Sequence, residues 1–358
     1  MITDSIWDVF PTSITILPTY RCNAACEQCC FESNPDVVGR LSRSQLLDSI
    51  REAKAAFPAL KMIVFSGGEC FLLKQDLYDA IALAHELGLT TRCVTNAFWG
   101  KTQKNAEAVV AKLLAAGVTE INISTGRDHQ RWVPFPSVET AASALVAAGI
   151  PALVTVEADG KDSDCVRAAA ESKIFVELLK THPALFRLQQ NVWMPFNTAF
   201  DPTRTSADNA SIYEGCQQLY TNMVITPHAK LSSCCGLTFE HIPEMKLGDI
   251  SRGLRSLAES QLDDFLKVWL AVDGPGTIMT RLFGDDVRDE LKTVNHICHA
   301  CVLMYKHPDV RAALRERAPE FVNEVMARFN LQVVLKSREV ASLQSFANRK
   351  NNPVMEVA

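Results

Sequence analysis

Short apolar runs rich in β-branched residues alternate with longer amphipathic stretches through the first 200 residues of the chain. The short runs predict buried strands, and the longer stretches, apolar at every third or fourth position, predict helices. Strands are expected at residues 13–19, 61–66, 90–96, 119–125, 151–157 and 186–194. Helices are expected after a capping box at Ser42 and Gln45, over 76–86, 103–116 and 137–148, and near 165–180.

Strand–helix alternation at a spacing of about 30 residues predicts right-handed βαβ units around a parallel sheet, either open or closed into a barrel. In both forms, ligands bind at the carboxyl ends of the strands. Three unusual segments follow predicted strands: a cysteine-rich loop at 20–32, Gly-Gly-Glu at 67–69 and TNAFWG at 95–100. We therefore expect these segments to meet at one edge of an α/β fold.

The pattern changes after the last of these predicted strands. Residues 197–211 form a polar linker, and residues 221–236 predict two strands joined by a tight turn. The stretch 308–350 has helical periodicity. We therefore divide the chain into a core at 1–200, an extension at 201–307 and a helical tail at 308–358.

The composition is that of an ordinary folded protein, since 47% of the 358 residues are hydrophobic and 22% are charged. A net charge of −5 provides no basic field for nucleic acid or for an anionic membrane. The first 20 residues lack the basic and apolar regions of a signal peptide, and no run of 18 apolar residues occurs. We expect a cytoplasmic protein, and we expect that the clustered cysteines among its twelve bind metal or do redox chemistry rather than form disulfides.

Cys22, Cys26 and Cys29 form a C-x3-C-x2-C pattern directly after the first predicted strand. A structural zinc site needs four ligands, commonly as two C-x2-C pairs, and this loop has no matching partner. Three thiolates suit a [4Fe–4S] cluster whose fourth iron stays open to a small molecule. The pattern resembles the signature of the radical S-adenosylmethionine (SAM) enzymes. That resemblance implies an α/β fold, a partial (β/α)6 barrel, in which the three cysteines hold the cluster that binds SAM.

Other segments resemble the same superfamily. Gly67, Gly68 and Glu69 resemble its Gly-Gly-Glu motif, which holds the amino group of SAM. Glycines let the backbone approach a ligand, and a carboxylate pairs with an ammonium group. The resemblance also implies that polar residues at the ends of the third and fourth strands contact the ribose and carboxylate of SAM. These residues are Thr95, Asn96 and Ser124.

A second set of cysteines lies in the other half of the chain: Cys216, Cys234, Cys298 and Cys301. Four thiolates are enough to close a second [4Fe–4S] cluster or a zinc site. The order of one cysteine, a hairpin, a loop and a C-x2-C resembles the SPASM and twitch extensions of radical SAM enzymes, which implies an auxiliary cluster. His296 and His299 flank the last cysteine pair and are alternative ligands.

The strings RCNAACEQCCFESNP, FSGGECFL, TNAFWG, SSCCG and ICHAC carry a closer resemblance. They resemble the radical SAM epimerases of ribosomally made peptides, of the epipeptide epimerase type. In that type a cysteine beside an auxiliary-cluster ligand gives a hydrogen atom to the substrate, and Cys235 is the matching position. The implied partners are a peptide and a one-electron donor such as flavodoxin or ferredoxin.

The chain departs from these families at two places. Many radical SAM enzymes have an aromatic residue just before the third cysteine, near the adenine of SAM, where this chain has Gln28. The epimerase type has an aspartate and a histidine after the fourth strand. Asp128 and His129 are their displaced counterparts here.

The sequence therefore predicts a two-cluster radical SAM enzyme. We expect it to cleave SAM to a 5′-deoxyadenosyl radical, to remove a hydrogen atom from a peptide Cα and to return one from Cys235. Two alternatives stay open. One is crosslinking of a peptide or oxidation of a small molecule, with the auxiliary cluster accepting an electron. The other is a zinc-binding interaction protein that is not an enzyme.

Overall fold

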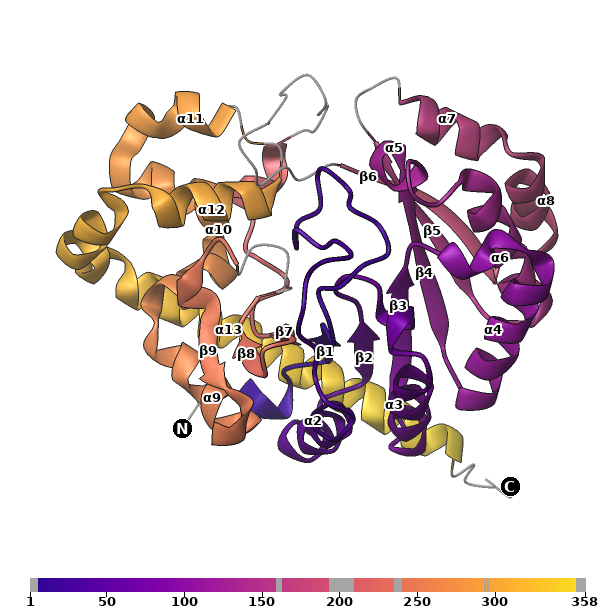
Figure 1. Ribbon diagram of the computed structural model, residues 1–358. Coiled ribbons are helices and arrows are strands. Elements are labelled where there is room, and N and C mark those ends of the chain that lie inside the picture. The colour runs from indigo at the N-terminus through magenta and orange to yellow at the C-terminus, as the bar shows by residue number, and fades with distance from the viewer. Residues whose placement is uncertain are drawn as a thin grey trace, which may run out of the picture.

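The structure is a computed structural model that describes residues 6–158, 163–192, 209–234, 240–292, 294 and 296–351. The strands are β1 (Ser13–Ile16), β2 (Met62–Phe65), β3 (Thr90–Thr95), β4 (Glu120–Gly126), β5 (Ala152–Ala158), β6 (Phe186–Val192), β7 (Asn222–Ile225), β8 (Lys230–Ser232) and β9 (Lys246–Asp249). Within the described residues they form one nine-stranded sheet in the order β6-β5-β4-β3-β2-β1-β7-β8-β9 (Figure 1).

Strands β1 to β6 are neighbours in chain order and all run parallel, as consecutive βαβ units do. Each strand predicted in this half is present with boundaries that differ by a few residues, so the predicted α/β class is confirmed. Residues 193–194, predicted to end the last of these strands, lie outside the described residues. The helices of this half are α2 (Arg43–Ala56), α3 (Gln75–Glu86), α4 (Gln103–Ala116), α5 (Arg127–Gln130), α6 (Phe135–Ala147), α7 (Asp164–Glu171) and α8 (Lys173–Thr181).

Side-chain caps decide where two of these helices begin. The capping box predicted at Ser42 and Gln45 is present and starts α2. The single helix predicted near 165–180 is wrong, because the chain forms two helices there. The Ser172 hydroxyl accepts a hydrogen bond from Phe175 N (3.2 Å) and starts α8 directly after α7.

The two faces of the parallel sheet differ in polarity. Ile121 and Val154 are fully buried in the hydrophobic core. Asn122, Thr155 and Gln189 lie on the other face of the same strands, since successive residues of a strand point to opposite sides. The Thr155 hydroxyl donates to Asn122 Oδ1 (3.0 Å), and the Gln189 amide donates to Thr155 Oγ1 (3.0 Å). The inner face of β4 to β6 is therefore polar, which leaves it available to line a cavity.

The second half of the chain extends the same sheet. Strand β7 pairs in parallel with β1, with Asn222 opposite Ser13, and β8 and β9 follow antiparallel. The hairpin predicted within 221–236 is confirmed, with β7 and β8 as its strands. The helices of this half are α9 (Leu254–Glu259), α10 (Phe265–Phe283), α11 (Arg288–Lys292), α12 (Ile297–Lys306) and α13 (Val310–Asn351). Helix α13 matches the predicted helical tail.

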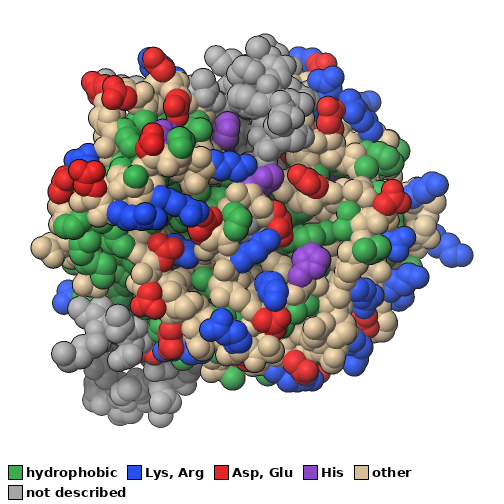
Figure 2. Space-filling model, turned by 60° about the vertical axis from the view of Figure 1, so that its left-hand side comes forward, with side chains coloured by type: hydrophobic (Ala, Val, Ile, Leu, Met, Phe, Trp, Pro, Cys, Tyr) green, Lys and Arg blue, Asp and Glu red, His purple; other side chains and the backbone are tan. Residues whose placement is uncertain are grey.

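Charges of both signs share the surface. On the face drawn in Figure 2, Lys and Arg side chains are interspersed with Asp and Glu, and hydrophobic side chains show between them. In the part of the chain that the structure describes, no helix is long and apolar enough to cross a membrane. Even α13, which is 42 residues long, carries charged residues along its length.

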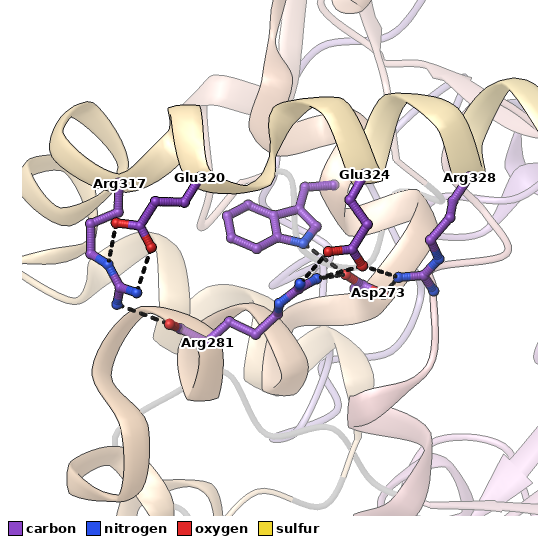
Figure 3. Close-up of polar contacts among 7 residues, drawn as sticks. Asp273, Arg281, Arg317, Glu320, Glu324 and Arg328 are labelled. Atoms are coloured by element: carbon purple, nitrogen blue, oxygen red, sulfur yellow. Dashed lines mark hydrogen bonds and ion pairs between the residues drawn. The ribbon is translucent and has the colours of Figure 1, made fainter.

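An ion-pair cluster joins α10 to α13 (Figure 3). Asp273 on α10 has only 6% of its side chain exposed, and its carboxylate contacts Arg281 Nη1 (3.1 Å) and Arg328 Nη1 (2.6 Å). The Trp269 indole N–H donates to the same carboxylate (2.9 Å), and Glu324 on α13 pairs with Arg281 (2.5 Å). Because an unpaired buried carboxylate is costly, this cluster favours one arrangement of the two helices.

Candidate functional site

The loop between β1 and α2 carries the first cysteine pattern. Cys22, Cys26 and Cys29 all line one cavity of about 350 Å³ at the carboxyl ends of the parallel strands. Burial raises the pKa of the Cys22 thiol to about 11. Burial and the neighbouring Cys29 raise the pKa of Cys26 well above its usual value. Thiols in such surroundings ionise when a positively charged metal centre binds them.

Backbone hydrogen bonds join this loop to the end of β2. Gly68 N donates to Thr19 O (2.9 Å), and Glu69 N donates to Arg21 O (3.0 Å). A Cβ atom on Gly67, whose φ is +111°, would lie 2.4 Å from Thr19 O. A Cβ atom on Gly68 would lie 2.2 Å from Arg21 O. Both positions therefore require glycine, and both glycines line the cavity.

The Glu69 carboxylate is fully buried and does not line the cavity. It accepts hydrogen bonds from the Thr95 hydroxyl (3.0 Å to each oxygen), from Asn96 N (2.9 Å) and from Phe71 N (3.1 Å). Burial raises the pKa of this carboxyl to about 7, against the opposite effect of these bonds. The structure thus brings the two glycines of the motif to the cavity, whereas the Glu69 side chain joins the ends of β2 and β3.

The remaining polar residues expected to contact SAM reach the cavity. Thr95, Asn96 and Ser124 all line it. The Asn96 side-chain amide donates to Asn23 Oδ1 (3.0 Å), and its nitrogen lies 3.7 Å from Cys22 Sγ. An N–H group beside a cysteine sulfur stabilises the thiolate, as hydrogen bonds to metal ligands do elsewhere.

The environment of Gln28 indicates whether the cavity fits SAM. Many family members have an aromatic residue at this position. The Gln28 side chain lines the cavity and is 6% exposed, and its Oε1 has no hydrogen-bond partner among the described residues. A buried amide oxygen without a partner is costly, so the site favours a ligand with an N–H donor. The amino group of adenine is such a donor. Three thiols and this amide therefore fit a cluster with SAM.

Polar residues that were not predicted from the sequence line the inner side of the cavity. Asn122, Thr155, Glu157, Gln189 and Asn191 line it from β4, β5 and β6. Their signal in the sequence is the alternation of polar and apolar residues along each strand. A parallel sheet packed on both faces has continuous apolar runs instead, so the alternation indicates one face that is not packed.

Asp128 and His129 lie on the short helix α5, directly after β4. His129 lines the cavity, and its Nδ1 is 2.6 Å from Glu157 Oε2. Burial acts to lower the pKa of His129, but Glu157 and Asp128 outweigh it, so the pKa lies above its ordinary value. Asp128 is fully buried, and neither of its carboxylate oxygens has a hydrogen-bond partner among the described residues. The raised pKa favours the protonated form of His129, whose charge would offset the negative charge of Glu157 and Asp128 close to Cys26.

The second cysteine set is brought together from three separate segments. Cys216, Cys234, Cys298 and Cys301 all line a second cavity, of about 630 Å³. The first of them precedes β7, the next follows β8, and the last two lie on α12. Cys235, the expected hydrogen-atom donor, lies outside the described residues.

Of the two flanking histidines, His296 lines the second cavity and His299 does not. His296 Nδ1 accepts a hydrogen bond from Cys298 N (3.1 Å) and so caps the start of α12. Burial lowers the pKa of both histidines, which favours neutral imidazoles. The capping bond uses one ring nitrogen of His296 and gives that residue a structural role.

A break in α10 positions Cys216. Gly274 has φ 74° and ψ 165° inside this helix, and Pro275 follows it. The Leu270 carbonyl, one turn before the break, accepts a hydrogen bond from Cys216 N (2.8 Å). A Cβ atom on Gly274 would lie 2.0 Å from Glu214 O. The segment that carries Cys216 therefore lies in direct backbone contact with the broken helix.

The two cavities adjoin. Phe31, Ser66, Val94 and Asn191 line both of them. A molecule in the second cavity would therefore lie between the two cysteine sets. In the described residues, no three His, Cys, Asp or Glu side chains are arranged to hold a single metal ion.

Residues 16–155 match the family model of the radical SAM superfamily. A curated relative from Bacillus subtilis (strain 168), the putative peptide biosynthesis protein YydG, is 25% identical over 131 residues. This alignment covers 37% of our chain and 41% of the relative, so it spans less than half of either protein. The solved structure of native anSMEcpe with bound AdoMet and Cp18Cys peptide is similar in fold, with a TM-score of 0.50 at 13% identity. That similarity covers 88% of this chain and 99% of the other.

The fold is thus the α/β partial barrel of the radical SAM type, followed by C-terminal helices. The stretch that matches the radical SAM family model, residues 16–155, contains the C-x3-C-x2-C pattern of the first cysteine loop. Enzymes of this class use a [4Fe–4S] cluster and SAM. The match agrees with the predicted class, and the metal-binding role of Cys22, Cys26 and Cys29 stays a prediction.

Proposed function

We propose that this enzyme inverts a residue of a ribosomally made peptide by removing the Cα hydrogen atom and returning one to the opposite face. The observation that carries the proposal is that the two cysteine sets line adjoining cavities. A peptide residue in the second cavity would lie next to both the first cavity and Cys234. In this proposal the hydrogen donor is Cys235, the next residue in the sequence. Epimerisation requires removal and return of hydrogen on opposite faces.

In this proposal the residues of the first cavity hold the cofactors. Cys22, Cys26 and Cys29 would bind the [4Fe–4S] cluster, and the main chain at Gly67 and Gly68 would lie along SAM. When bound, the cluster and SAM supply a 5′-deoxyadenosyl radical that takes the substrate hydrogen atom. The polar residues on the inner face of the sheet would form hydrogen bonds with the substrate and so orient its C–H bond. Thr95, Asn96 and Ser124 complete the SAM contacts.

The second set would hold an auxiliary [4Fe–4S] cluster. Cys216, Cys234, Cys298 and Cys301 are its ligands in this proposal. The Cys235 S–H bond breaks as the new substrate C–H bond forms. The sulfur radical left on Cys235 would be reduced by one electron from the one-electron donor protein and would take one proton from solvent. Each turnover thus leaves an isomerised peptide, methionine and 5′-deoxyadenosine.

Two comparisons support a peptide as the substrate. The relative from Bacillus subtilis is named for peptide biosynthesis, and native anSMEcpe has been solved with AdoMet and a peptide. Our chain matches only 41% of the first protein, so the shared substrate class is part of the proposal. The other partner in the proposal is a one-electron donor protein.

The first experiment counts iron and acid-labile sulfide after anaerobic reconstitution. We expect about eight iron per chain, falling to about four in Cys22/Cys26/Cys29→Ala. Cys165→Ala is the control, because Cys165 lies on α7 and lines neither cavity. About four iron falling to none would remove the auxiliary cluster and with it the role of Cys235. Zinc without sulfide would show a zinc-binding protein instead of an enzyme.

The second experiment follows hydrogen from solvent. A library of unmodified peptides is incubated in D2O with the reconstituted enzyme, SAM and dithionite, and the products are analysed by mass spectrometry. One deuterium at a single inverted residue is expected, and none in Cys235→Ala. The contradicting outcome is a crosslinked product, or a product with two fewer hydrogen atoms, that Cys235→Ala forms as readily as the native protein does.

A further inference from the structure

One aromatic side chain, that of Phe31, lies at the boundary between the first and the second cavity. The residues that line both cavities are Phe31, Ser66, Val94 and Asn191. Among the described residues that line either cavity, Phe31 is the only Phe, Tyr or Trp. The bulkiest side chain at this boundary therefore comes from the cysteine loop itself, two positions after Cys29.

The two cavities differ in polarity on the two sides of this boundary. Asn122 and Thr155 line the first cavity but not the second. Leu17 and Leu270 line the second cavity but not the first. A substrate in the second cavity would bury apolar groups there, and its part nearest to the SAM site would contact the Phe31 ring.

The ring of Tyr20 supports the ring of Phe31. The two ring centroids are 5.8 Å apart and the ring planes differ by 17°, which is a stacked arrangement. Tyr20 is only 7% exposed, and the His228 ring contacts it edge-on at a centroid distance of 5.8 Å. The surface against which Phe31 packs is therefore itself fixed.

A hydrogen bond ties Tyr20 to the second half of the chain. The Tyr20 hydroxyl donates to Glu240 Oε1 (2.9 Å), and Glu240 Oε2 pairs with Lys246 Nζ on β9 (2.5 Å). Burial and the neighbouring Glu240 carboxylate raise the pKa of Tyr20, so its hydroxyl keeps the proton that it donates. The orientation of the Tyr20 ring thus depends on a segment that follows the second cysteine set.

Main-chain hydrogen bonds also hold the segment around Phe31. Cys29 N donates to Cys26 O (3.2 Å), and Glu32 N donates to Cys29 O (3.1 Å). Glu32 has φ 52°, in the left-handed region, so the chain turns sharply directly after Phe31. Both the ring and the main chain of Phe31 are therefore held in place before a substrate arrives.

We infer that Phe31 positions the reacting residue of the substrate and limits the size of its side chain. The inference rests on the proposed function, in which a peptide residue occupies the second cavity beside the SAM site. A side chain that is too large would meet the Phe31 ring before its C–H bond reaches the first cavity. Because a displacement of about 1 Å can lower a rate about a hundredfold, this contact selects the residue that reacts. Tyr20 and Glu240 act through Phe31 as positioning residues.

Substitutions that shrink or enlarge the ring test the inference. Each reconstituted variant is incubated with the pooled unmodified peptides, SAM and dithionite in D2O, and mass spectrometry identifies every modified residue, whatever the modification is. Phe31→Ala should shift the ratio of large to small modified residues upward about tenfold, and Phe31→Trp should shift it downward about tenfold. Iron content and SAM affinity, measured by equilibrium dialysis, should stay native in both variants.

The matched control is Phe283→Ala. Phe283 is also a partly buried ring that packs on another ring, that of His307, with centroids 4.8 Å apart. It lines neither cavity, so the ratio of large to small modified residues should equal that of the native protein.

A second pair of substitutions tests the support of the ring. Tyr20→Phe keeps the stacked ring but removes the hydrogen bond to Glu240, and Glu240→Ala removes the same bond from the other side. Each should shift the ratio in the direction of Phe31→Ala by about threefold. Because both changes break one link, the double variant should shift the ratio no further than either change alone. Additive shifts would contradict the positioning role of Tyr20 and Glu240.

An unchanged ratio in both Phe31→Ala and Phe31→Trp, with native iron content and SAM affinity, would overturn the inference. Loss of iron or of SAM binding in both variants would also overturn it, because Phe31 would then only support the cysteine loop. Failure of the proposed function looks different: the modified residues would be crosslinked or oxidised instead of deuterated, while their sizes would still report on Phe31. A native protein that modifies no peptide would overturn both.

Discussion

The two cysteine sites of this protein are built in opposite ways. Cys22, Cys26 and Cys29 lie within one loop, and their cavity is completed by residues at the ends of neighbouring strands. Cys216 and Cys301 stand at the two ends of a much longer stretch, and their cavity depends on β8, α10 and α12 together. The first site is local in sequence, and the second is a product of packing. A different kind of substitution should therefore disrupt metal binding at each site.

The supports of the two sites also differ. Backbone hydrogen bonds to the end of β2 hold the first loop. A broken helix holds Cys216, and the buried Asp273 cluster links that helix to α13. Loss of a backbone contact disturbs one loop, whereas loss of a helix contact disturbs every segment packed on it. The expected effects below are arranged from the largest to the smallest.

Two glycine substitutions should break the sites one at a time. Gly68→Ala places a Cβ atom 2.2 Å from Arg21 O and should remove the iron of the first site while the second keeps about four. Gly274→Ala places a Cβ atom 2.0 Å from Glu214 O and should do the reverse. Each should lower the free energy of unfolding by about 3 kcal/mol or more, because backbone atoms cannot move aside easily. Iron counts and electron paramagnetic resonance of each cluster provide the measurement.

The matched control for the second site is Gly284→Ala. Gly284 follows α10 with φ +68°, so alanine there is strained too, but nothing lies within 4 Å of the added Cβ atom. We expect a loss of about 1 kcal/mol and an unchanged iron count. Equal iron losses in Gly274→Ala and Gly284→Ala would show that strain alone, and not contact with the Cys216 segment, explains the effect.

Removal of a charge from the α10–α13 cluster should weaken the support of the second site. Asp273→Asn leaves Arg281 and Arg328 without their shared buried carboxylate, which should cost about 3 kcal/mol of unfolding free energy. Urea denaturation of the native protein and the variant provides the measurement. Glu320→Gln is the control, since Glu320 pairs with Arg317 on the exposed side of α13 and such pairs contribute about 0–1 kcal/mol. Similar losses in both variants would contradict a special role for Asp273.

The first site should respond to pH through Glu69. The folded protein raises the pKa of this carboxyl to about 7, whereas an unfolded chain has a value of about 4.3. The folded state thus binds the proton more tightly, and its advantage is full below about pH 4.3 and is lost as pH rises towards 7. Between pH 5 and 7 this group should lower the free energy of unfolding by about 2 kcal/mol. Urea denaturation at several pH values should show that the free energy of unfolding declines less with pH in Glu69→Gln than in the native protein. Parallel curves for the two proteins would contradict the raised pKa.

Much of the core fold was predictable because strands and caps are local. The prediction of a strand at 90–96 agrees with Thr90–Thr95, since alternating burial depends on residues two positions apart. The capping box at Ser42 was predicted for the same reason. The division between α7 and α8 was missed although Ser172 is a typical N-cap, because apolar periodicity continues across it. The apolar periodicity and the N-cap signal disagree there, and the hydrogen bond at the cap decides where α8 begins.

The candidate site was predictable only in part. The spacing of its cysteines indicated a cluster, and Gly67 and Gly68 lie at the cavity as expected. The direction of the Glu69 side chain was not predictable, because it depends on where the main-chain N–H groups of Asn96 and Phe71 lie after folding. Likewise, only the relative placement of β8, α10 and α12 shows which cysteines of the second half share a cavity.

By itself, the sequence determined that three cysteines within eight positions would lie close together in one loop. It also determined the order of strands and helices in the core. Only the tertiary structure decided that the cysteines between positions 216 and 301 come together and that the two cavities adjoin. The physical reason is that local geometry follows from a few backbone torsions. A contact between residues that are far apart in the sequence is opposed by the entropy lost when the intervening chain is closed into a loop. Only the packing of whole helices and strands provides enough free energy to offset that loss.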